Sequence, residues 1–205
     1  MSELRTTYRT LDELSMGIYK EKGSKFIGLA IACYTEAEAK VYLENWRKEH
    51  YQSRHLCYAY RFGVDKKLYR ANDDGEPNNS AGAPILGQIQ SFDLSNVLIG
   101  VVRYYGGTKL GVGGLIQAYR TAAREAIEAG EIIETEVFEW NLLRFGYDAM
   151  PQVMNFIKQN QLMSREQDFG TECSLKVLLP LKYASYLRGE LSEFKNVESE
   201  IIGIF

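Results

Sequence analysis

A glycine-rich stretch that also carries basic side chains is the part of this 205-residue chain best suited to binding a ligand. Its sequence is RYYGGTKLGVGG, from Arg103 to Gly114, and it stands between an apolar segment and an amphipathic one. Glycine removes the Cβ that keeps a ligand from the backbone. A helix that begins after such a loop presents free N–H groups and the positive end of its dipole. We therefore expect an anion here, although Leu110 after Lys109 rules out a Walker loop and the spacing is not that of a dinucleotide fingerprint. The alternative is that the glycines only let a strand turn tightly into a packed helix.

An acidic loop, NDDGEPNNSAG, covers residues 72–82 and is the second candidate. Asp73, Asp74 and Glu76 place three carboxylates close together, and hard cations bind such oxygen clusters. The spacing is not that of a calcium-binding loop, however, and Asp-Gly followed by Glu-Pro is typical of a tight turn. We expect a rigid structural loop without a metal ion.

His55 and Cys57 are two residues apart on a predicted strand and so share one face of it. Together they could form a nucleophile and its base. No third residue is evident to orient the histidine, and a packed cysteine beside a half-buried histidine is the simpler interpretation. Since His50 is the one other histidine, we expect no histidine metal site and no cofactor.

Aromatic residues lie close in sequence to basic ones in the first part of the chain. These are Tyr58, Tyr60, Phe62, Tyr104, Tyr105 and Tyr119. Nucleic-acid bases stack on such rings while lysine and arginine pair with phosphate. The alternative is that the rings belong to the core, as at least half must. We expect Arg61, Arg103 and Lys109 at the surface.

The elements that must position these residues follow from periodicity and turn chemistry. Residues 8–34 predict a β-hairpin that turns at Lys22–Ser24, and Thr35 with Glu38 forms a capping-box pattern before a helix to about His50. The apolar face of that helix is expected to comprise Ala37, Val41, Tyr42 and Trp46. Later elements are a strand at 55–62, an extended piece at 67–70, a short helix through residue 90, a buried strand at 96–105 and a helix ending at Gly130.

After Gly130 the pattern starts again. Strands are predicted at 138–147, 163–169, 173–179 and 197–204, with helices at 149–160 and 182–194. This order is βαββαβ, that of a ferredoxin-like domain. We take the charged segment 131–136 as a linker, which gives an α+β protein of two domains, residues 1–133 and 134–205.

The composition is that of a folded protein, with 45% hydrophobic and 25% charged residues. No apolar run approaches the roughly 20 residues needed to cross a bilayer, and the first residues lack the apolar stretch of a signal peptide. Three cysteines without CxxC spacing argue against disulfides and favour the cytoplasm. The net charge of −3 arises from the second domain, so it does not argue against nucleic-acid binding by the first.

Four segments resemble the IMPACT family. They are KGSKFIG at 22–28, HLCYAYRFG at 55–63, NDDGEPNNSAGAPIL at 72–86 and VRYYGGTKLGVGGLIQAY at 102–119. The layout of the whole chain is similar to that family, while the diagnostic motifs lie in the first domain. This chain departs from the family at Asn78–Ser80, where Ser-Gly-Thr is usual, and at Ala83 and Gln117, where basic residues are frequent. Without basic residues at these two positions we expect weaker phosphate binding, although Arg120 could replace one of them.

The resemblance implies a first domain with an α/β fold that is also found in a small-subunit ribosomal protein and in translational GTPases. It implies a second domain like the last domain of elongation factor G. Family members are linked to translational control, and the eukaryotic ones regulate a kinase of the initiation pathway by competing for its activator. Nucleic-acid binding has been proposed for the bacterial members.

Our hypothesis is a non-enzymatic, cytoplasmic binding protein that engages RNA or ribosome-associated components through the first domain, with no membrane partner. The glycine loop would form the floor of the site and the acidic loop its wall. The expected site residues are Arg103, Tyr104, Gly106, Gly107, Lys109, Gly111, Gly113, Gly114, Asp73, Asp74, Gly75, Glu76 and Arg61. The alternatives are a protein–protein adaptor, or a hydrolase that uses the acidic loop or the His55–Cys57 pair.

Overall fold

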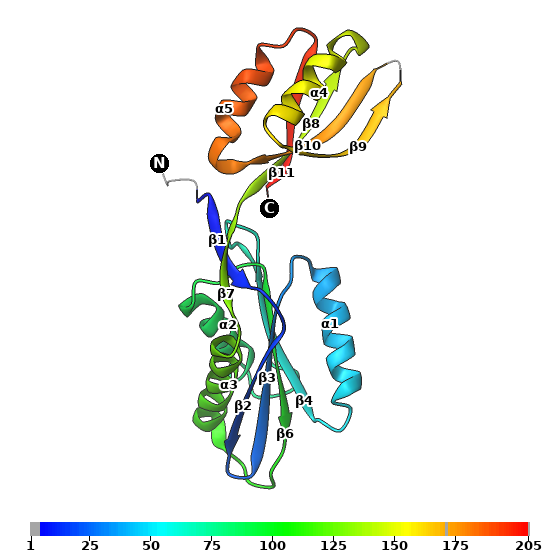
Figure 1. Ribbon diagram of the computed structural model, residues 1–205. Helices are drawn as coiled ribbons and strands as arrows, with labels where there is room; N and C mark the ends of the chain where they lie inside the picture. Colours follow the sequence, from blue (N-terminus) through cyan, green and yellow to red (C-terminus); the bar gives the residue numbers. More distant parts are fainter. Residues whose placement is uncertain (1–4, 171, 205) are drawn as a thin grey trace. The chain divides into compact units, whose positions relative to one another are not determined.

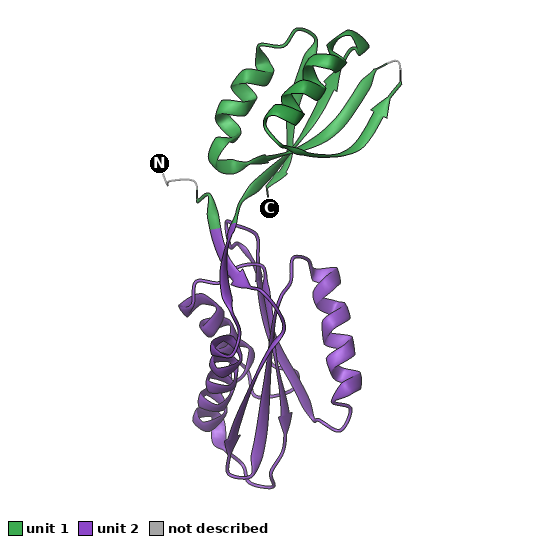
Figure 2. Ribbon diagram, viewed as in Figure 1, with its two compact units in different colours: residues 1–7, 136–205 green, residues 8–135 purple. Residues whose placement is uncertain are grey.

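The computed structural model describes residues 5–170 and 172–204 (Figure 1). The chain divides into two compact units, Tyr8–Thr135 and Glu136–Phe205, the second of which also takes Met1–Thr7 (Figure 2). We call them the N-terminal unit and the C-terminal unit. The division falls two residues beyond the expected one, and it places the start of the chain with the later unit.

The N-terminal unit is built on a five-stranded antiparallel sheet in the order β2-β3-β6-β4-β5. Its strands are β2 (Ser15–Glu21), β3 (Ser24–Ala32), β6 (Val97–Tyr104), β4 (His55–Phe62) and β5 (Leu68–Asn72). Helix α1 (Glu36–Glu49) covers one face, and α2 (Gly82–Ser91) with α3 (Gly111–Glu128) covers the other (Figure 1). The mixed α/β architecture expected from the sequence is therefore present.

Strand alternation assigns each side chain of the sheet to one of two cores. On β6, Ile99 and Val101 pack with α2 and α3, whereas Leu98 and Val102 pack on the side of α1. Because β6 is central and buried on both faces, its apolar run is continuous, as the sequence predicted. The same alternation places Arg103 on the α3 side and Tyr104 on the α1 side.

The start of α1 follows its prediction, but its buried face does not. The Thr35 hydroxyl accepts a hydrogen bond from the Glu38 N–H at 3.1 Å. The helix buries Ala39 and Trp46, while Val41, expected on the apolar face, is 57% exposed. Ala37 is exposed as well. Tyr42 and Trp46 fit either of two apolar faces of the helix, one with Val41 and one with Ala39. The face that contains Ala39 packs on the sheet.

The segment expected to be a linker instead contains a strand. β7 (Ile132–Glu136) pairs with β1 (Thr7–Leu11) in a separate two-stranded sheet. The first strand predicted for the hairpin is consequently two strands, β1 and β2, with different partners. The sequence did not reveal this because the partner of β7 lies more than a hundred residues away along the chain.

The C-terminal unit has the predicted order of elements. These are β8 (Phe138–Phe145), a short 3-10 turn (Tyr147–Ala149), α4 (Met150–Gln159), β9 (Met163–Phe169), β10 (Cys173–Pro180), α5 (Leu181–Ser192) and β11 (Val197–Ile204). The strand order is β11-β8-β10-β9, and α4 and α5 share one core with the sheet. Within the described residues, no helix is long and apolar enough to span a membrane.

Candidate anion-binding cleft

The acidic loop and the glycine loop meet at a cleft of about 460 Å³ in the N-terminal unit. Glu76 and Pro77 line it from the acidic loop, and Lys109 and Gly111 line it from the glycine loop and the start of α3. The pairing of β4 with β6 sets His55 opposite Arg103, which brings the two loops to the same end of the sheet. The structure thus joins the two motifs that the sequence singled out.

The first turn of α3 is open to the cleft. Its N-cap residue is Leu110, and no side chain caps the helix among the described residues. Gly107 and Gly111 have φ angles of +85° and +72°, which side chains rarely adopt. The free N–H groups of this turn and the helix dipole therefore favour an anion.

Gly113 needs neither an unusual backbone angle nor a close contact. A Cβ built on it would meet nothing within 4 Å. A helical glycine costs roughly 0.5–1 kcal/mol relative to alanine, so this one lacks a structural explanation. It leaves the backbone of the first turn accessible.

Gly106 and Gly114 differ from Gly113. A Cβ on Gly106 would lie 1.9 Å from the carbonyl carbon of Gly23, so this glycine allows the loop to pack on the β2–β3 turn. A Cβ on Gly114 would lie 3.0 Å from that of Leu110. Packing accounts for Gly106, one of the residues expected to bind a ligand.

Arg103 is buried, with 7% of its surface exposed, contrary to the expectation that it lies at the surface. Its Nη1 donates to Glu76 Oε1 at 2.5 Å, and its guanidinium lies 5.5 Å from the ring centres of both Phe26 and Tyr105. Arg103 nevertheless lines the cleft, and its Nε has no hydrogen-bond partner among the described residues. A buried donor of this kind is costly unless something satisfies it.

Glu76 is buried too and serves as a partner inside the protein. Besides Arg103, its Oε1 accepts a hydrogen bond from the Tyr119 hydroxyl at 2.8 Å. Burial is the main reason that the pKa of Tyr119 lies well above its ordinary value, and the neighbouring Cys57 and Glu76 add to it. The hydroxyl thus remains protonated and available to donate.

The two aspartates hold the acidic loop together. Asp73 accepts hydrogen bonds from the backbone N–H groups of Asn79, Ala81 and Gly82 at 2.8–3.0 Å. Asp74 Oδ2 accepts from the Leu56 N–H at 2.7 Å and from Arg47 at 2.8 Å. Gly75, with a φ angle of +85°, completes the turn. In the described part of the chain, no three acidic, histidine or cysteine side chains gather as a metal site.

His55 and Cys57 are each bonded to the acidic loop. His55 Nδ1 lies 2.7 Å from the carbonyl oxygen of Asp74, and the Cys57 thiol donates to that of Asp73 at 3.0 Å. Burial raises the pKa of Cys57, which is the opposite of what an activated thiol requires.

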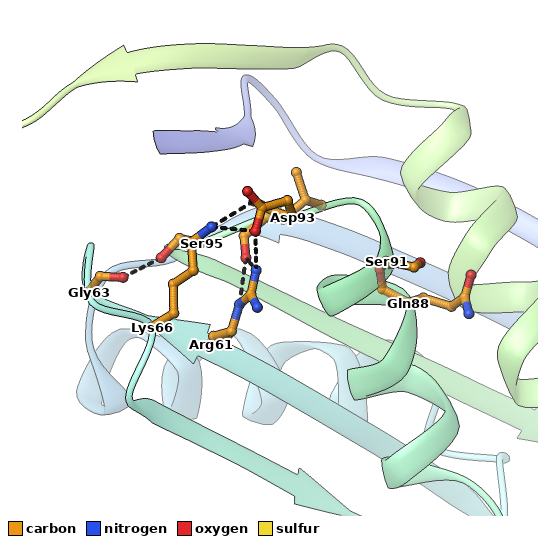
Figure 3. A network of polar contacts seen from close by, with 8 residues as sticks. Arg61, Gly63, Lys66, Gln88, Ser91, Asp93 and Ser95 are labelled. Atoms are coloured by element: carbon orange, nitrogen blue, oxygen red, sulfur yellow. Dashed lines mark hydrogen bonds and ion pairs between the residues drawn. The ribbon is translucent and has the colours of Figure 1, made fainter. Parts of the chain in front are cut away.

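Two of the expected site residues, Arg61 and Tyr104, lie away from the cleft. Six more belong to its loops or to the start of α3 without lining it themselves: Asp73, Asp74, Gly106, Gly107, Gly113 and Gly114. Arg61 is buried at the far end of β4, about 20 Å along the strand from His55 at 3.3 Å per residue. It donates to the carbonyl of Leu94, beside an ion pair between Lys66 and Asp93 (Figure 3). A buried carbonyl and a carboxylate stabilise its charge there, which sequence spacing did not reveal.

Tyr104 is the second displaced residue. It lies on the α1 side, where its hydroxyl is 3.0 Å from His50 Nδ1. Its neighbour Tyr105 lines the cleft instead, as does the exposed Arg54, which was not among the residues expected at the site. The position of Arg54, one residue before β4, was the available clue. Tyr58, Tyr60 and Phe62 stack on one another on the α1 side and do not line the cleft.

Comparison with known proteins identifies the family. The Impact N-terminal domain matches residues 22–127, which is more than half of the chain and includes both loops of the cleft. The chain belongs to the IMPACT family. IMPACT family members of similar sequence include YvyE of Bacillus subtilis, 29% identical over 178 residues, which are 87% of this chain and 82% of YvyE. YigZ of Escherichia coli is 29% identical over 186 residues, 89% of this chain and 91% of YigZ.

A family member from Haemophilus influenzae is 30% identical over 183 residues, 86% of this chain and 87% of that protein. Among solved structures, one titled "Crystal structure of an hypothetical protein" superposes with a TM-score of 0.81 at 26% identity. The superposed region covers 98% of this chain and 99% of the chain in that structure. The structural similarity therefore covers both units of this IMPACT family chain.

Proposed function

We propose that this protein acts in translational control in the cytoplasm, and that its N-terminal unit binds RNA or an RNA component of the translation apparatus. The cleft would hold a phosphate group of that RNA. The observation that carries the proposal is the uncapped start of α3, which opens onto a cleft that Arg54, Arg103 and Lys109 also line.

The charges of the cleft favour an anion. The helix dipole places about half a positive charge at the start of α3. Among the lining side chains, Glu76 and Arg103 neutralise one another, which leaves the exposed Arg54 and Lys109 as uncompensated cations. A phosphate at the first turn would also bring an acceptor toward the Nε of Arg103, which has no hydrogen-bond partner among the described residues.

The proposal is for a binding protein without catalytic activity, since the candidate catalytic groups are engaged in the fold. Burial keeps the Cys57 thiol protonated, and the carboxylates of Asp73 and Asp74 accept backbone N–H groups. The C-terminal unit, whose strand order β11-β8-β10-β9 suits a ferredoxin-like domain, would act as a second contact with the translation apparatus.

The test measures binding of labelled single-stranded RNAs of several sequences by fluorescence anisotropy as the salt concentration rises. Lys109→Ala should weaken all of them to a similar degree and reduce the magnitude of the salt slope by about 0.7, because one phosphate contact is lost. Gly113→Val should weaken binding through crowding and change the slope less.

Lys67→Ala is the matched control, because Lys67 is an exposed lysine that pairs with Asp65 outside the cleft. It should bind as the parent does. If the parent binds no RNA at low salt, or if folded Lys109→Ala and Gly113→Val bind as well as the parent, the proposal is wrong.

A protein adaptor is the second candidate, and one observation favours it. Met16 and Ile18 on the edge strand β2 are 49% and 45% exposed, beside Leu14 at 52%. Exposed apolar side chains in a row are typical of a contact surface. A complex formed through them would persist as salt rises, whereas a phosphate-driven complex would weaken steeply.

A further inference from the structure

A second hollow, also of about 460 Å³, follows the first along α3. Val112 of α3 lines the first cleft, and Ile116 and Arg120 line the second, so consecutive turns of the helix form one wall of both. On the opposite wall, Pro77 belongs to the first and Asn79 to the second. The two hollows therefore run in series between α3 and the acidic loop with the start of α2.

Gly87 leaves open space beside α2, as Gly113 does at the start of α3. It lies inside α2 and lines the hollow, and a Cβ on it would meet nothing within 4 Å. No positive φ requires it. Among the helical glycines of the N-terminal unit, Gly87 and Gly113 are the two that neither packing nor backbone angle explains. In both places the missing side chain leaves open space beside a helix, and at Gly87 this space is part of the hollow.

The remaining groups of the hollow suit a nucleotide. Arg120 is exposed and can pair with a phosphate, while the Asn79 and Gln88 amides can donate to or accept from a base edge. No carboxylate is among the described residues that line the hollow, and that of Asp73 accepts backbone N–H groups from Asn79, Ala81 and Gly82. Arg124, one turn further along α3, pairs with Glu128 and does not line the hollow.

We propose that this hollow is a second subsite for the RNA that the first cleft binds, with Arg120 as its phosphate contact, so that the ligand is a single strand lying along α3. The inference rests on the proposed function and adds the ligand class. Nine residues separate Gly111 from Arg120, about 14 Å at 1.5 Å per residue. That distance corresponds to roughly four nucleotides at 3.4 Å per phosphate of a stacked strand.

The experiment compares two unstructured RNAs with 5′ phosphates, an oligouridine of eight nucleotides and one of two. The octamer should bind more tightly, because the dinucleotide is too short to reach both subsites. Arg120→Ala should weaken the octamer about fivefold, equivalent to about 1 kcal/mol for an exposed ion pair, and reduce the magnitude of its salt slope by about 0.7. The affinity of the same variant for the dinucleotide, which binds in the first cleft, should be unchanged.

Gly87→Gln provides a variant that tests access without altering charge. It should weaken the octamer and spare the dinucleotide, and it should raise the melting temperature because glutamine is the better helix former. Arg124→Ala is the matched control for Arg120→Ala and should leave both RNAs unaffected.

If Arg120→Ala and Gly87→Gln bind the octamer as the parent does, the second subsite is wrong, while a Lys109→Ala effect on the dinucleotide would still support the first. If neither RNA binds the parent protein, the proposed function fails and the second subsite fails with it.

Discussion

At the scale of single residues, the buried pair of Glu76 and Arg103 determines how much charge the cleft presents. Both residues are buried, with 8% of Glu76 and 7% of Arg103 exposed. Removing one partner of such a pair leaves the other charge buried without compensation, which is much more costly than replacing both. We infer that Glu76 stabilises Arg103 at the base of the cleft and does not itself contact the ligand.

This role predicts the effect of Glu76→Gln. The variant should lose about 3 kcal/mol of unfolding free energy, because the Arg103 charge remains buried without its carboxylate. Urea denaturation measures the loss. The double variant Glu76→Leu/Arg103→Met should recover part of it, and a double variant no more stable than Glu76→Gln would contradict the assignment.

The buried thiols predict how stability depends on alkaline pH. Burial raises the pKa of Cys33 from 9.0 to about 12. Below pH 9 the thiol is protonated in both the folded and the unfolded chain. Above pH 9 the unfolded chain loses this proton first, so stability should fall as pH rises toward 12. Urea denaturation between pH 8 and pH 11 should show this fall, and Cys33→Ala should make it less steep; identical slopes would disprove the contribution.

At the scale of elements, the glycines of the glycine loop and the start of α3 have different structural roles. Gly107 and Gly111 have positive φ angles. Gly106 lets two turns of the backbone touch, and Gly113 leaves open space. Close packing therefore requires a glycine at position 106, whereas the glycine at position 113 leaves the backbone accessible. The same contrast separates Gly87 from the glycines of the sheet.

Two alanine substitutions test this contrast. Gly113→Ala should raise the unfolding free energy by about 0.5–1 kcal/mol, since alanine is the better helix former and has room there. Gly106→Ala should lower it by about 1–3 kcal/mol, because its Cβ would collide with the Gly23 backbone. Thermal or urea denaturation gives both values. A destabilised Gly113→Ala would mean that the fold itself requires this glycine, and the access argument would fail.

At the scale of the whole molecule, each unit has its own buried core. The C-terminal core contains Leu143, Phe156 and Leu187, from its sheet and both of its helices. A layer of helices on a four-stranded sheet is a complete architecture. Within this unit the Val137 N–H donates a hydrogen bond to the Thr6 carbonyl at 2.8 Å.

We predict that residues 136–205, expressed alone, fold and melt cooperatively, because their core is self-contained. Circular dichroism during heating provides the measurement. Losing the bond to Thr6 should lower the melting temperature by about 4–8 °C, since one backbone hydrogen bond contributes about 1 kcal/mol. A broad, non-cooperative melt would show that the unit depends on the remainder of the chain.

The sequence by itself determined most of the local structure. Strands β4, β9 and β11 begin and end where they were predicted, since alternation and turn residues act over a few neighbours. The cap at Thr35 was also predictable, because it involves residues three apart. The family was recognisable from its motifs, and both loops were predicted to belong to one site.

Only the tertiary structure decided which side chains face the cleft. Arg61 and Arg103 were expected at the surface, yet each is buried with a partner from a distant segment, Leu94 and Glu76 respectively. Tyr104 and Tyr105 could have exchanged sides, and the register of β6 assigned them. The tertiary structure also decided three further features: the pairing of β1 with β7, the buried face of α1, and the hollow between α2 and α3. Each depends on contacts between segments far apart in the chain, which local spacing does not encode.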